Sequence, residues 1–254
     1  MGDKVPDMAS RKVLVTGASR GIGAAIAQAF AARGDRIAVH HRASPDLAAT
    51  VLAGLPGDGH LVVSGDLADP DAVRTFVDAA ATGLGGLDVV VNNAAVAIGH
   101  PILEQDYDDW QEAWQETLAV NLLGPANVCW CAARHLGPGG RIVNVSSRGA
   151  FRGEPRYPAY GASKAGLNSL TQSLASVLAP RGIAVTAVAP GFTETEMGRA
   201  VMDSGDGDAI RAQSPFNRVA RPEEVAAAVL YLASPEAEWS SGAVLDLNGA
   251  SYFR

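Results

Sequence analysis

A phenol and an ammonium group stand four residues apart in the segment Tyr160-Gly161-Ala162-Ser163-Lys164. In a helix this spacing places two side chains on one face, one turn apart. A free tyrosine has a pKa of about 10, too high for proton transfer near neutral pH, and a nearby lysine favours the phenolate and lowers that pKa. The pair could therefore act as a general acid and base. Taken alone, the same spacing also fits an ordinary surface pair.

A serine hydroxyl could complete this unit. Ser147 precedes Tyr160 by 13 residues, at the end of a strand predicted over 141–145, and could hold a substrate oxygen beside the phenol. Ser146 is its neighbour, but successive strand residues point to opposite faces, so only one of the two serines can meet the tyrosine. Only Tyr160 has a lysine four residues later, so Tyr157 is expected to line the substrate pocket or to pack.

A glycine-rich turn lies near the start of the chain. Gly17-Ala18-Ser19-Arg20-Gly21-Ile22-Gly23 follows a β-branched run and precedes an alanine-rich, helix-prone segment. Glycines at such a junction permit a tight turn and let the backbone approach the diphosphate of a dinucleotide at the helix N-terminus. The spacing differs from the common Gly-x-Gly-x-x-Gly pattern, and the glycines alone would also fit an ordinary turn.

The elements that must position these residues alternate along the chain. Strands are predicted over 12–16, 36–40, 60–64, 87–91, 141–145, 183–188 and 243–247, and helices over 22–33, 46–52, 69–81, 106–135, 159–178 and 223–233. Strands that are apolar on both faces and separated by helices are typical of a covered parallel sheet. We predict an α/β Rossmann fold in one domain over 1–254, with a seven-stranded, doubly wound parallel sheet and helices on both faces. A long loop over 193–220 could act as a lid or lie idle on the surface.

Polar residues follow several of the predicted strands, at the ends where a doubly wound sheet binds its ligands. Asp66 follows the third strand, Asn92-Asn93 the fourth, Ser146-Ser147 the fifth and Pro190-Gly191 the sixth. This shared location favours a dinucleotide site more strongly than any one motif does.

These residues resemble the short-chain dehydrogenase/reductases from about Lys12 to Gly249. The motifs that carry the resemblance are TGASRGIG at 16–23, NNAA at 92–95, Asn121, Ser147, YGASK at 160–164 and PGFTET at 190–195. The family more often has NNAG, so NNAA is a departure at a backbone contact. The resemblance implies an oxidoreductase that interconverts a ketone and a secondary alcohol with a nicotinamide cofactor.

The resemblance also implies a role for each residue. Tyr160 would be the acid or base, Lys164 would lower its pKa and hold the nicotinamide ribose, and Ser147 would polarise the substrate oxygen. Asn121 would support a water that links Lys164 to solvent. Tyr160 and Ser147 are thus expected to contact the substrate. The expected cofactor-binding residues are Gly17, Ser19, Arg20, Gly21, Ile22, Gly23, His41, Arg42, Asp66, Leu67, Asn93, Ala94, Tyr160, Lys164, Pro190, Gly191, Thr193 and Thr195.

The end of the second predicted strand favours NADP(H) over NAD(H). An NAD site typically places an acidic residue there to bind the ribose hydroxyls. This chain reads Val39-His40-His41-Arg42 and has no acid before Asp46. Arg42, flanked by Arg20, could bind the extra phosphate through charge-assisted hydrogen bonds, while His41 takes the place of the missing acid. The alternative is that Arg42 is a solvated charge at a strand end.

The sequence does not identify the substrate. Reduction of a 3-oxoacyl thioester on a carrier protein is a leading candidate, because the stretch PGFTETEM looks like such reductases. Arg148, Arg152 and Arg156 could form a landing patch for an acidic carrier, or could be ordinary solvated charges. Sugars, steroids and polyols are alternatives. A cofactor-binding regulator without catalysis is a further alternative, against which the intact set of catalytic residues speaks.

Composition restricts the partners. The 254 residues carry 20 Lys and Arg against 27 Asp and Glu, a net charge of −7, which disfavours a nucleic-acid partner. No segment is apolar and long enough to span a bilayer, so we expect no membrane partner and a cytoplasmic location. The two cysteines exclude a disulfide scaffold, and the five histidines predict no metal site. The resemblance implies a homotetramer, assembled through the helical segments 113–133 and 159–178 and an apolar tail.

Overall fold

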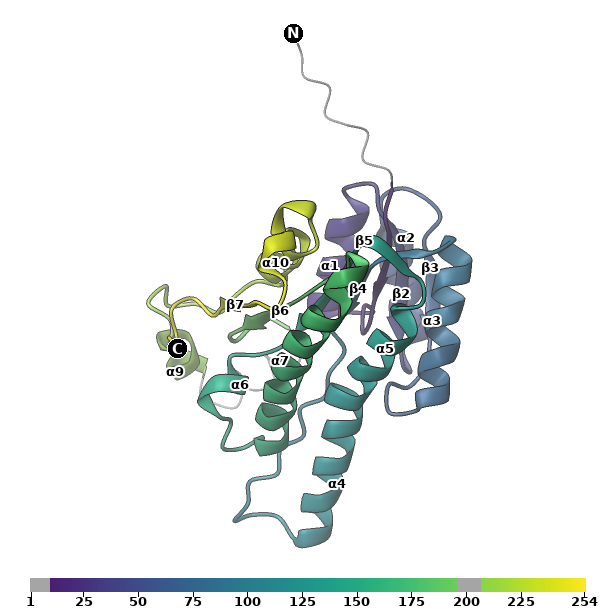
Figure 1. The fold of residues 1–254 in the computed structure, drawn as a ribbon. Coiled ribbons are helices and arrows are strands. Elements are labelled where there is room, and N and C mark those ends of the chain that lie inside the picture. Colours follow the sequence, from purple (N-terminus) through teal and green to yellow (C-terminus); the bar gives the residue numbers. More distant parts are fainter. Residues whose placement is uncertain (1–9, 196–206) are drawn as a thin grey trace.

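The computed structural model describes residues 10–195 and 207–254 (Figure 1). Seven strands form one parallel sheet in the order β3-β2-β1-β4-β5-β6-β7, so the strand order reverses between β1 and β4. The strands are β1 (Lys12–Val15), β2 (Arg36–His41), β3 (Leu61–Ser64), β4 (Leu87–Asn92), β5 (Leu136–Val145), β6 (Ala184–Pro190) and β7 (Val244–Leu247). The predicted seven-stranded Rossmann sheet is confirmed.

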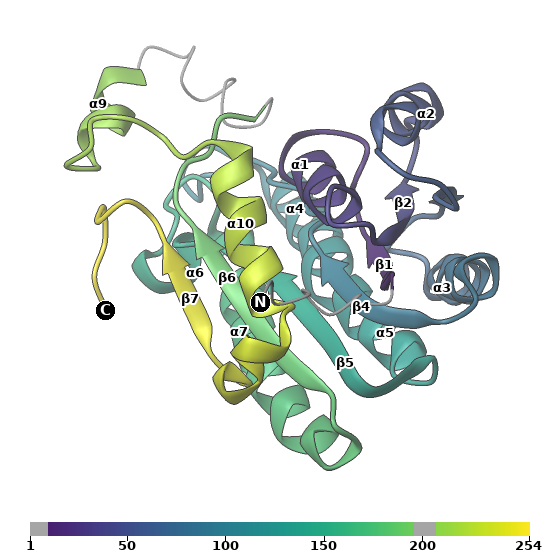
Figure 2. The same cartoon turned by 90° about the horizontal axis from the view of Figure 1, so that it is seen from above.

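Helices cover both faces of this sheet (Figure 2). One face packs against α1 (Gly21–Ala31), α2 (Pro45–Gly54) and α10 (Pro222–Leu232). The other packs against α3 (Pro70–Leu84), α5 (Gly124–Ala132) and α7 (Pro158–Leu178). The remaining helical segments are α4 (Tyr107–Leu118), η1 (Ala119–Leu123), α6 (Gly149–Arg152), η2 (Ala179–Arg181), α9 (Gly207–Ala212) and η4 (Pro235–Ser240).

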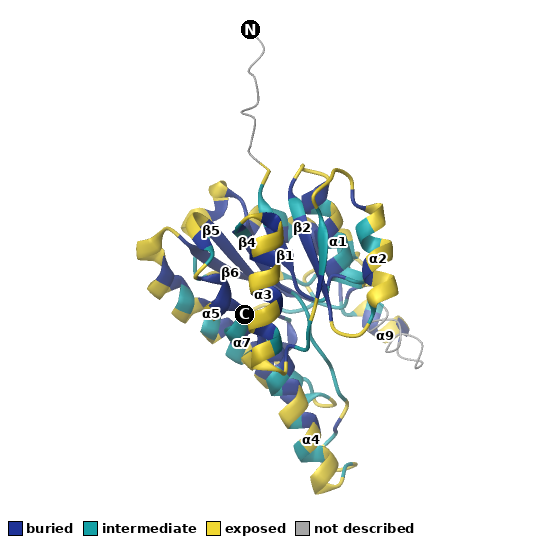
Figure 3. Cartoon of the chain, turned by 90° about the vertical axis from the view of Figure 1, so that its right-hand side faces the viewer, coloured by how far each residue is buried: buried dark blue, intermediate teal, exposed yellow. Residues whose placement is uncertain are grey.

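The central strands contribute to a core on each side of the sheet. In β1, Val13 and Val15 pack into the core beside α1, whereas Leu14 packs into the core beside α3, and all three side chains are fully buried. Figure 3 shows the same pattern as a layer of buried strands beneath half-exposed helices. Burial on both faces explains why the strand sequences are continuously apolar.

The helical zone predicted over 106–135 is interrupted at η1, which has π-helical hydrogen bonding. The backbone N–H of Gly124 donates to the carbonyl of Ala119, five residues earlier. The next residue is Pro125, which has no N–H to give to the carbonyl of Asn121, so the regular helical pattern cannot continue there. The interruption places Asn121 on an irregular turn, and single-turn π segments of this kind are frequent at functional sites.

The zone predicted as a long loop over 193–220 has more structure than expected. It contains α9, and Thr193 pairs with Ala220 in an isolated parallel bridge, which draws the two ends of the zone together. Residues 196–206 of this zone lie outside the described residues.

Within the described chain, none of the helices has the length and apolar character needed to cross a membrane.

Candidate active site

The glycine loop between β1 and α1 is shaped by close contacts with other segments. Gly17 and Gly21 have positive φ values of 64° and 56°, in the left-handed region that favours glycine. A Cβ atom at Gly17 would lie 2.8 Å from the Cα of Ala94, and one at Gly23 would lie 2.3 Å from the carbonyl oxygen of Gly17. The loop therefore packs directly against the segment after β4, and Gly21 faces the side chain of Thr195.

Two side chains tie the end of β1 to the end of β4. The hydroxyl of Thr16 accepts hydrogen bonds from the backbone N–H groups of Asn93 (3.0 Å) and Ala94 (3.1 Å). In return, the amide nitrogen of Asn93 donates to the carbonyls of Thr16 (2.9 Å) and Gly17 (3.1 Å). Asn93 and Ala94, expected to contact the cofactor, thus also hold the glycine loop, and Thr16 is a positioning residue that the sequence analysis missed.

His40 links the glycine loop to β3. Its Nδ1 atom accepts a hydrogen bond from the N–H of Gly17 (3.1 Å), which leaves the proton on Nε2 to donate to the carbonyl of Gly65 (3.1 Å). Burial lowers the pKa of His40 to about 4, despite the bond to Gly65, so the ring is neutral at neutral pH. The ring also packs against Phe76. Sequence reasoning missed this role because a histidine on a strand end carries no specific signal.

The end of β2 presents one exposed cation. Arg42 is 54% exposed and lies 3.9 Å from the carboxylate of Asp66, which is 42% exposed. His41, by contrast, is buried, and its Nδ1 atom accepts a hydrogen bond from the N–H of Ser44. The side chain of Leu67 is buried in the core beside Gly124. Of these expected cofactor residues, Arg42 and Asp66 offer charged groups at the surface, whereas His41 and Leu67 point inward.

The structure places Ser147, and not Ser146, beside Tyr160. The hydroxyl of Ser147 lies close enough to the phenol to lower its pKa, and its Oγ accepts from the N–H of Gly149 (3.0 Å). The hydroxyl of Ser146 donates instead to the carbonyl of Lys164 (3.3 Å). The opposite directions of neighbouring strand side chains account for this difference. Tyr157 lies just before α7, with its ring beside the backbone of Gly99.

The expected lowering of the pKa of Tyr160 by Lys164 is not what the structure displays. The Lys164 Nζ donates to the carbonyl of Val145 (2.8 Å) and lies 5.7 Å from the centroid of the Tyr160 ring. Burial raises the pKa of Tyr160; the nearby hydroxyl of Ser147 opposes this, and the charge of Glu154 adds to it. Burial also lowers the pKa of Lys164 to about 8. Desolvation therefore favours the neutral forms of both groups.

The side chain of Asn121 is hydrogen-bonded to the loop after β4. Its Oδ1 accepts from the N–H of Val96 (2.8 Å), while its Nδ2 donates to the Val96 carbonyl (2.8 Å) and to the hydroxyl of Ser163 (3.3 Å). Both amide hydrogens are engaged within the protein. A water near Lys164, which the resemblance implies, would therefore have to be held by an oxygen of Asn121.

The remaining expected residues lie along the same edge of the sheet. Pro190 ends β6 and accepts a hydrogen bond from the N–H of Arg148, and Gly191 packs against Asn248. Thr193 and Thr195 continue this segment, with Thr195 reaching the glycine loop. The carboxyl ends of β1, β2, β4, β5 and β6 thus contribute to one region, as the doubly wound arrangement predicts.

Comparison with known proteins agrees with this geometry. Residues 17–249 match the family model described as Enoyl-(Acyl carrier protein) reductase. The D-threitol dehydrogenase of Mycolicibacterium smegmatis is 38% identical, over 93% of this chain and 90% of that protein. The crystal structure of a short chain dehydrogenase from Burkholderia cenocepacia in complex with NADP is 39% identical, with a TM-score of 0.87 over 95% of this chain and 97% of that one.

The chain belongs to the short-chain dehydrogenase/reductase family. It is accordingly a nicotinamide-dependent oxidoreductase. A 39% identical short-chain type dehydrogenase/reductase of Sinorhizobium fredii, itself uncharacterized, matches 94% of this chain but is longer, and the match spans only 43% of its length.

One feature of this short-chain dehydrogenase/reductase contradicts a sequence-based expectation. Arg148, Arg152 and Arg156 do not form one surface patch. Arg148 is only 3% exposed, and its guanidinium donates to Ser251 and Gln213, whereas Arg152 and Arg156 are exposed. Arg148 is therefore neither a landing site for an acidic carrier nor a solvated loop charge.

The buried His40 makes the stability of the enzyme depend on pH. Because its pKa is about 4 when folded and 6.5 ordinarily, the unfolded chain takes up this proton first as the pH falls. The contribution of His40 to stability is therefore full above pH 6.5 and is lost between pH 6.5 and 4, by roughly 3 kcal/mol. Urea unfolding of His40→Gln should show a smaller decline over this range than the wild type.

His60 provides a matched control. Its ring also accepts a backbone N–H on one nitrogen and faces a backbone carbonyl with the other, but it is only half-buried. His60→Gln should keep the wild-type decline. An equal decline in His40→Gln and wild type would show that His40 does not set this dependence.

Proposed function

We propose that this protein is an NADP(H)-dependent oxidoreductase that interconverts a ketone and a secondary alcohol. The observation that carries the proposal is the proximity of the Ser147 hydroxyl to the Tyr160 phenol, beside Lys164 and at the sheet edge that also holds the glycine loop. A hydroxyl donor, a phenol and an ammonium group at one place are the parts that proton transfer to a carbonyl oxygen requires. Turnover of NADPH with a panel of ketones tests the proposal directly.

The residues present fit a dinucleotide. Gly17 and Gly21 adopt the backbone conformation that only glycine takes readily, and they form the turn into the N-terminus of α1, where a diphosphate is favoured. Ser19, Arg20, Ile22 and Gly23 complete this turn. When bound, the cofactor supplies or accepts the hydride, while the protein holds and orients it. Pro190, Gly191, Thr193 and Thr195 would hold its nicotinamide side.

The chain's own residues handle the proton. Ser147 would donate a hydrogen bond to the carbonyl oxygen, and Tyr160 would deliver its proton to that oxygen as the alcohol forms. Because the pKa of Tyr160 is raised, the phenol is protonated throughout the neutral range, which is the form that ketone reduction needs. Lys164, buried beside the ring, would support Tyr160 and bind the ribose. Asn121 would keep the loop after β4 in place.

Removing the phenol oxygen should abolish catalysis without loss of binding. We expect Tyr160→Phe to lower kcat by about 100- to 10,000-fold, the usual contribution of a general acid or base. The affinity for NADPH, measured by fluorescence, should stay close to that of the wild type. Tyr157→Phe is the matched control and should retain most of the turnover. Wild-type turnover in Tyr160→Phe, with loss in Tyr157→Phe, would reverse the assignment.

The charge of Glu154 should move the pH profile of alcohol oxidation. Oxidation needs the phenolate, so its rate rises with pH towards the pKa of Tyr160, which Glu154 helps to raise. Glu154→Gln removes this negative charge and should shift the rising limb to lower pH. Glu223→Gln, at an exposed site on α10, is the control and should leave the profile unchanged. An unshifted profile in Glu154→Gln would contradict this coupling.

Preference for NADP(H) is proposed from the charges near β2. No acidic residue belongs to the strand end, and Arg42 is exposed there. Asp66 lies within ion-pair distance of Arg42. A bound phosphate would therefore compete with Asp66 for the guanidinium of Arg42. Relatives of known structure support a preference for NADP(H). The short chain dehydrogenase from Burkholderia cenocepacia and the angucycline C-6 ketoreductase LanV were both crystallised with NADP.

Substitutions at this strand end should change the cofactor preference. Arg42→Ala should reduce the ratio of kcat/KM for NADPH over NADH by about tenfold or more, because a charge-assisted hydrogen bond contributes roughly 1.5–3 kcal/mol. His41→Asp introduces a carboxylate and should shift the preference towards NADH. Both kcat/KM values are measured for each variant at one ionic strength. Equal efficiency with the two cofactors in the wild type would refute the preference.

The substrate is proposed only as a class of small carbonyl compound. Relatives named 3-oxoacyl-[acyl-carrier-protein] reductase and acetoacetyl-CoA reductase support a 3-oxoacyl thioester, whereas D-threitol dehydrogenase supports a polyol. The burial of Arg148 weakens the case for a carrier protein, because only Arg152 and Arg156 of the expected patch remain at the surface. A panel containing a 3-oxoacyl thioester, a ketose and a steroid ketone separates these candidates.

A homotetramer and a cytoplasmic location stay predictions. The helices expected to form the subunit interface expose large apolar side chains, namely Leu123, Trp130 and Val177, which supports assembly through this face.

A further inference from the structure

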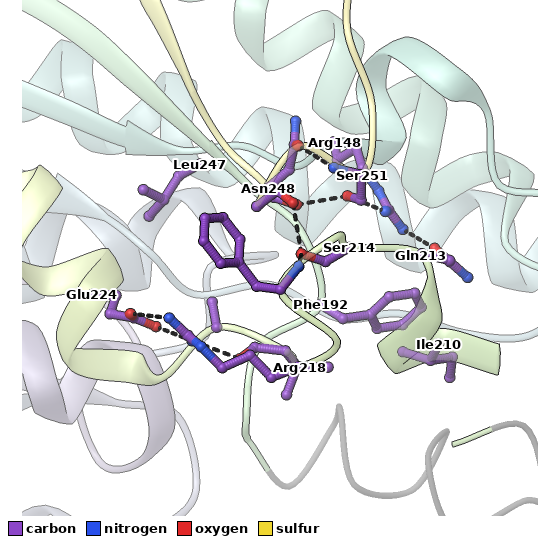
Figure 4. Close-up of a pocket in the computed structure, with 14 residues that line it drawn as sticks. Arg148, Phe192, Ile210, Gln213, Ser214, Arg218, Glu224, Leu247, Asn248 and Ser251 are labelled. Atoms are coloured by element: carbon purple, nitrogen blue, oxygen red, sulfur yellow. Dashed lines mark hydrogen bonds and ion pairs between the residues drawn. The ribbon is translucent and has the colours of Figure 1, made fainter. Parts of the chain in front are cut away.

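A cavity lies beyond the catalytic pair. It occupies about 210 Å³ between the segment after β6, the region of α9 and the segment after β7 (Figure 4). Neither Ser147 nor Tyr160 lines it. Its apolar walls are the side chains of Phe192, Ile210 and Phe216, and its polar part includes Arg148. The volume is below the roughly 300–1,000 Å³ typical of sites for drug-sized ligands, so an occupant must be small.

Arg148 brings to this cavity a positive charge that forms no ion pair with any described residue. Its guanidinium is almost completely buried, and its partners are neutral: the hydroxyl of Ser251 and the amide oxygen of Gln213 (2.9 Å). The same amide oxygen also accepts from Arg152 (3.2 Å), so two cations share one neutral acceptor. The ring of Phe192 lies 5.4 Å from the guanidinium and adds a weak attraction. None of these groups carries a negative charge.

The nearby acidic residues do not supply the missing charge. Glu224, which also lines the cavity, is engaged by both terminal nitrogens of Arg218 (2.7 and 2.8 Å) and by the N–H of Arg221. Glu154 is close enough to influence Arg148, but within the described part of the chain it forms no ion pair with it. A buried charge without an opposite partner is costly, because the desolvation is not repaid.

We propose that this cavity binds a small organic carboxylate, whose charge pairs with Arg148 and whose apolar part contacts Phe192, Ile210 and Phe216. A guanidinium has five N–H donors in a planar fork that matches a carboxylate, and the bonds to Ser251 and Gln213 leave others available. The proposal does not rest on the ketone reductase activity, since binding can be measured without turnover.

Calorimetric titration of the full chain with hexanoate tests the site, and hexanamide serves as its neutral counterpart. Hexanoate should bind at least about tenfold more tightly than hexanamide, because only the carboxylate pairs with the guanidinium. Acetate should bind more weakly than hexanoate, since it lacks the apolar part. Equal affinities of hexanoate and hexanamide for the wild-type protein would overturn the proposal, whatever the variants do.

Variants locate the binding. Arg148→Met should lose the preference for hexanoate over hexanamide, and Arg148→Lys should retain part of it. Arg156→Met, at an exposed site in the same loop, is the matched control and should bind hexanoate as the wild type does. Unchanged binding in a folded Arg148→Met would overturn the proposal.

Discussion

The site depends on the hydrogen bonds that join the ends of β1 and β4. At this point the strand order reverses, so the chain leaves the two strands in opposite directions, and doubly wound sheets bind their ligands at such a point. Thr16 and Asn93 join the two strand ends with four hydrogen bonds, two in each direction. A side chain at Gly17 would push Ala94 away and break this contact, which explains the glycine there better than the need for a turn alone.

Hydrogen bonds of two further side chains connect these strand ends to neighbouring segments on either side. On one side, His40 fixes the N–H of Gly17 and reaches Gly65 at the end of β3. On the other side, Asn121 pairs with the backbone of Val96 and reaches α7 through Ser163. The glycine loop and the helix that carries Tyr160 are thus joined through buried polar contacts. Each contact uses donors and acceptors that would be costly to leave unpaired, so the geometry is set before any ligand binds.

The sequence predicted the sheet, its strands and most helices because these follow from periodicity, which is local. The spacing of a helix also singled out Tyr160 over Tyr157, whereas strand alternation showed only that one of Ser146 and Ser147 can meet the tyrosine, and the family resemblance selected Ser147. The sequence could not predict the π-helical turn at Asn121, since an unbroken helix fits the same apolar pattern. The hydrogen bonds of His40 could not be predicted for another reason. Its partners, Gly17 and Gly65, are each more than twenty residues away in the sequence, one on either side. Those contacts arise only when the strands are paired.

The burial of Arg148 also depends on contacts between distant segments, which is why the sequence analysis placed this residue wrongly at the surface. Burial is also what makes this charged residue important. Desolvation drives titratable groups towards their neutral forms, and it acts in this direction on His40, Tyr160 and Lys164. These groups can respond by changing their protonation. An arginine cannot, because its guanidinium stays charged in proteins. Burial lowers the pKa of Arg148, but a guanidinium keeps its proton in proteins, so the charge persists in the cavity. Within the described residues no carboxylate forms an ion pair with it, and the cavity beside it provides the space for the anion that we propose.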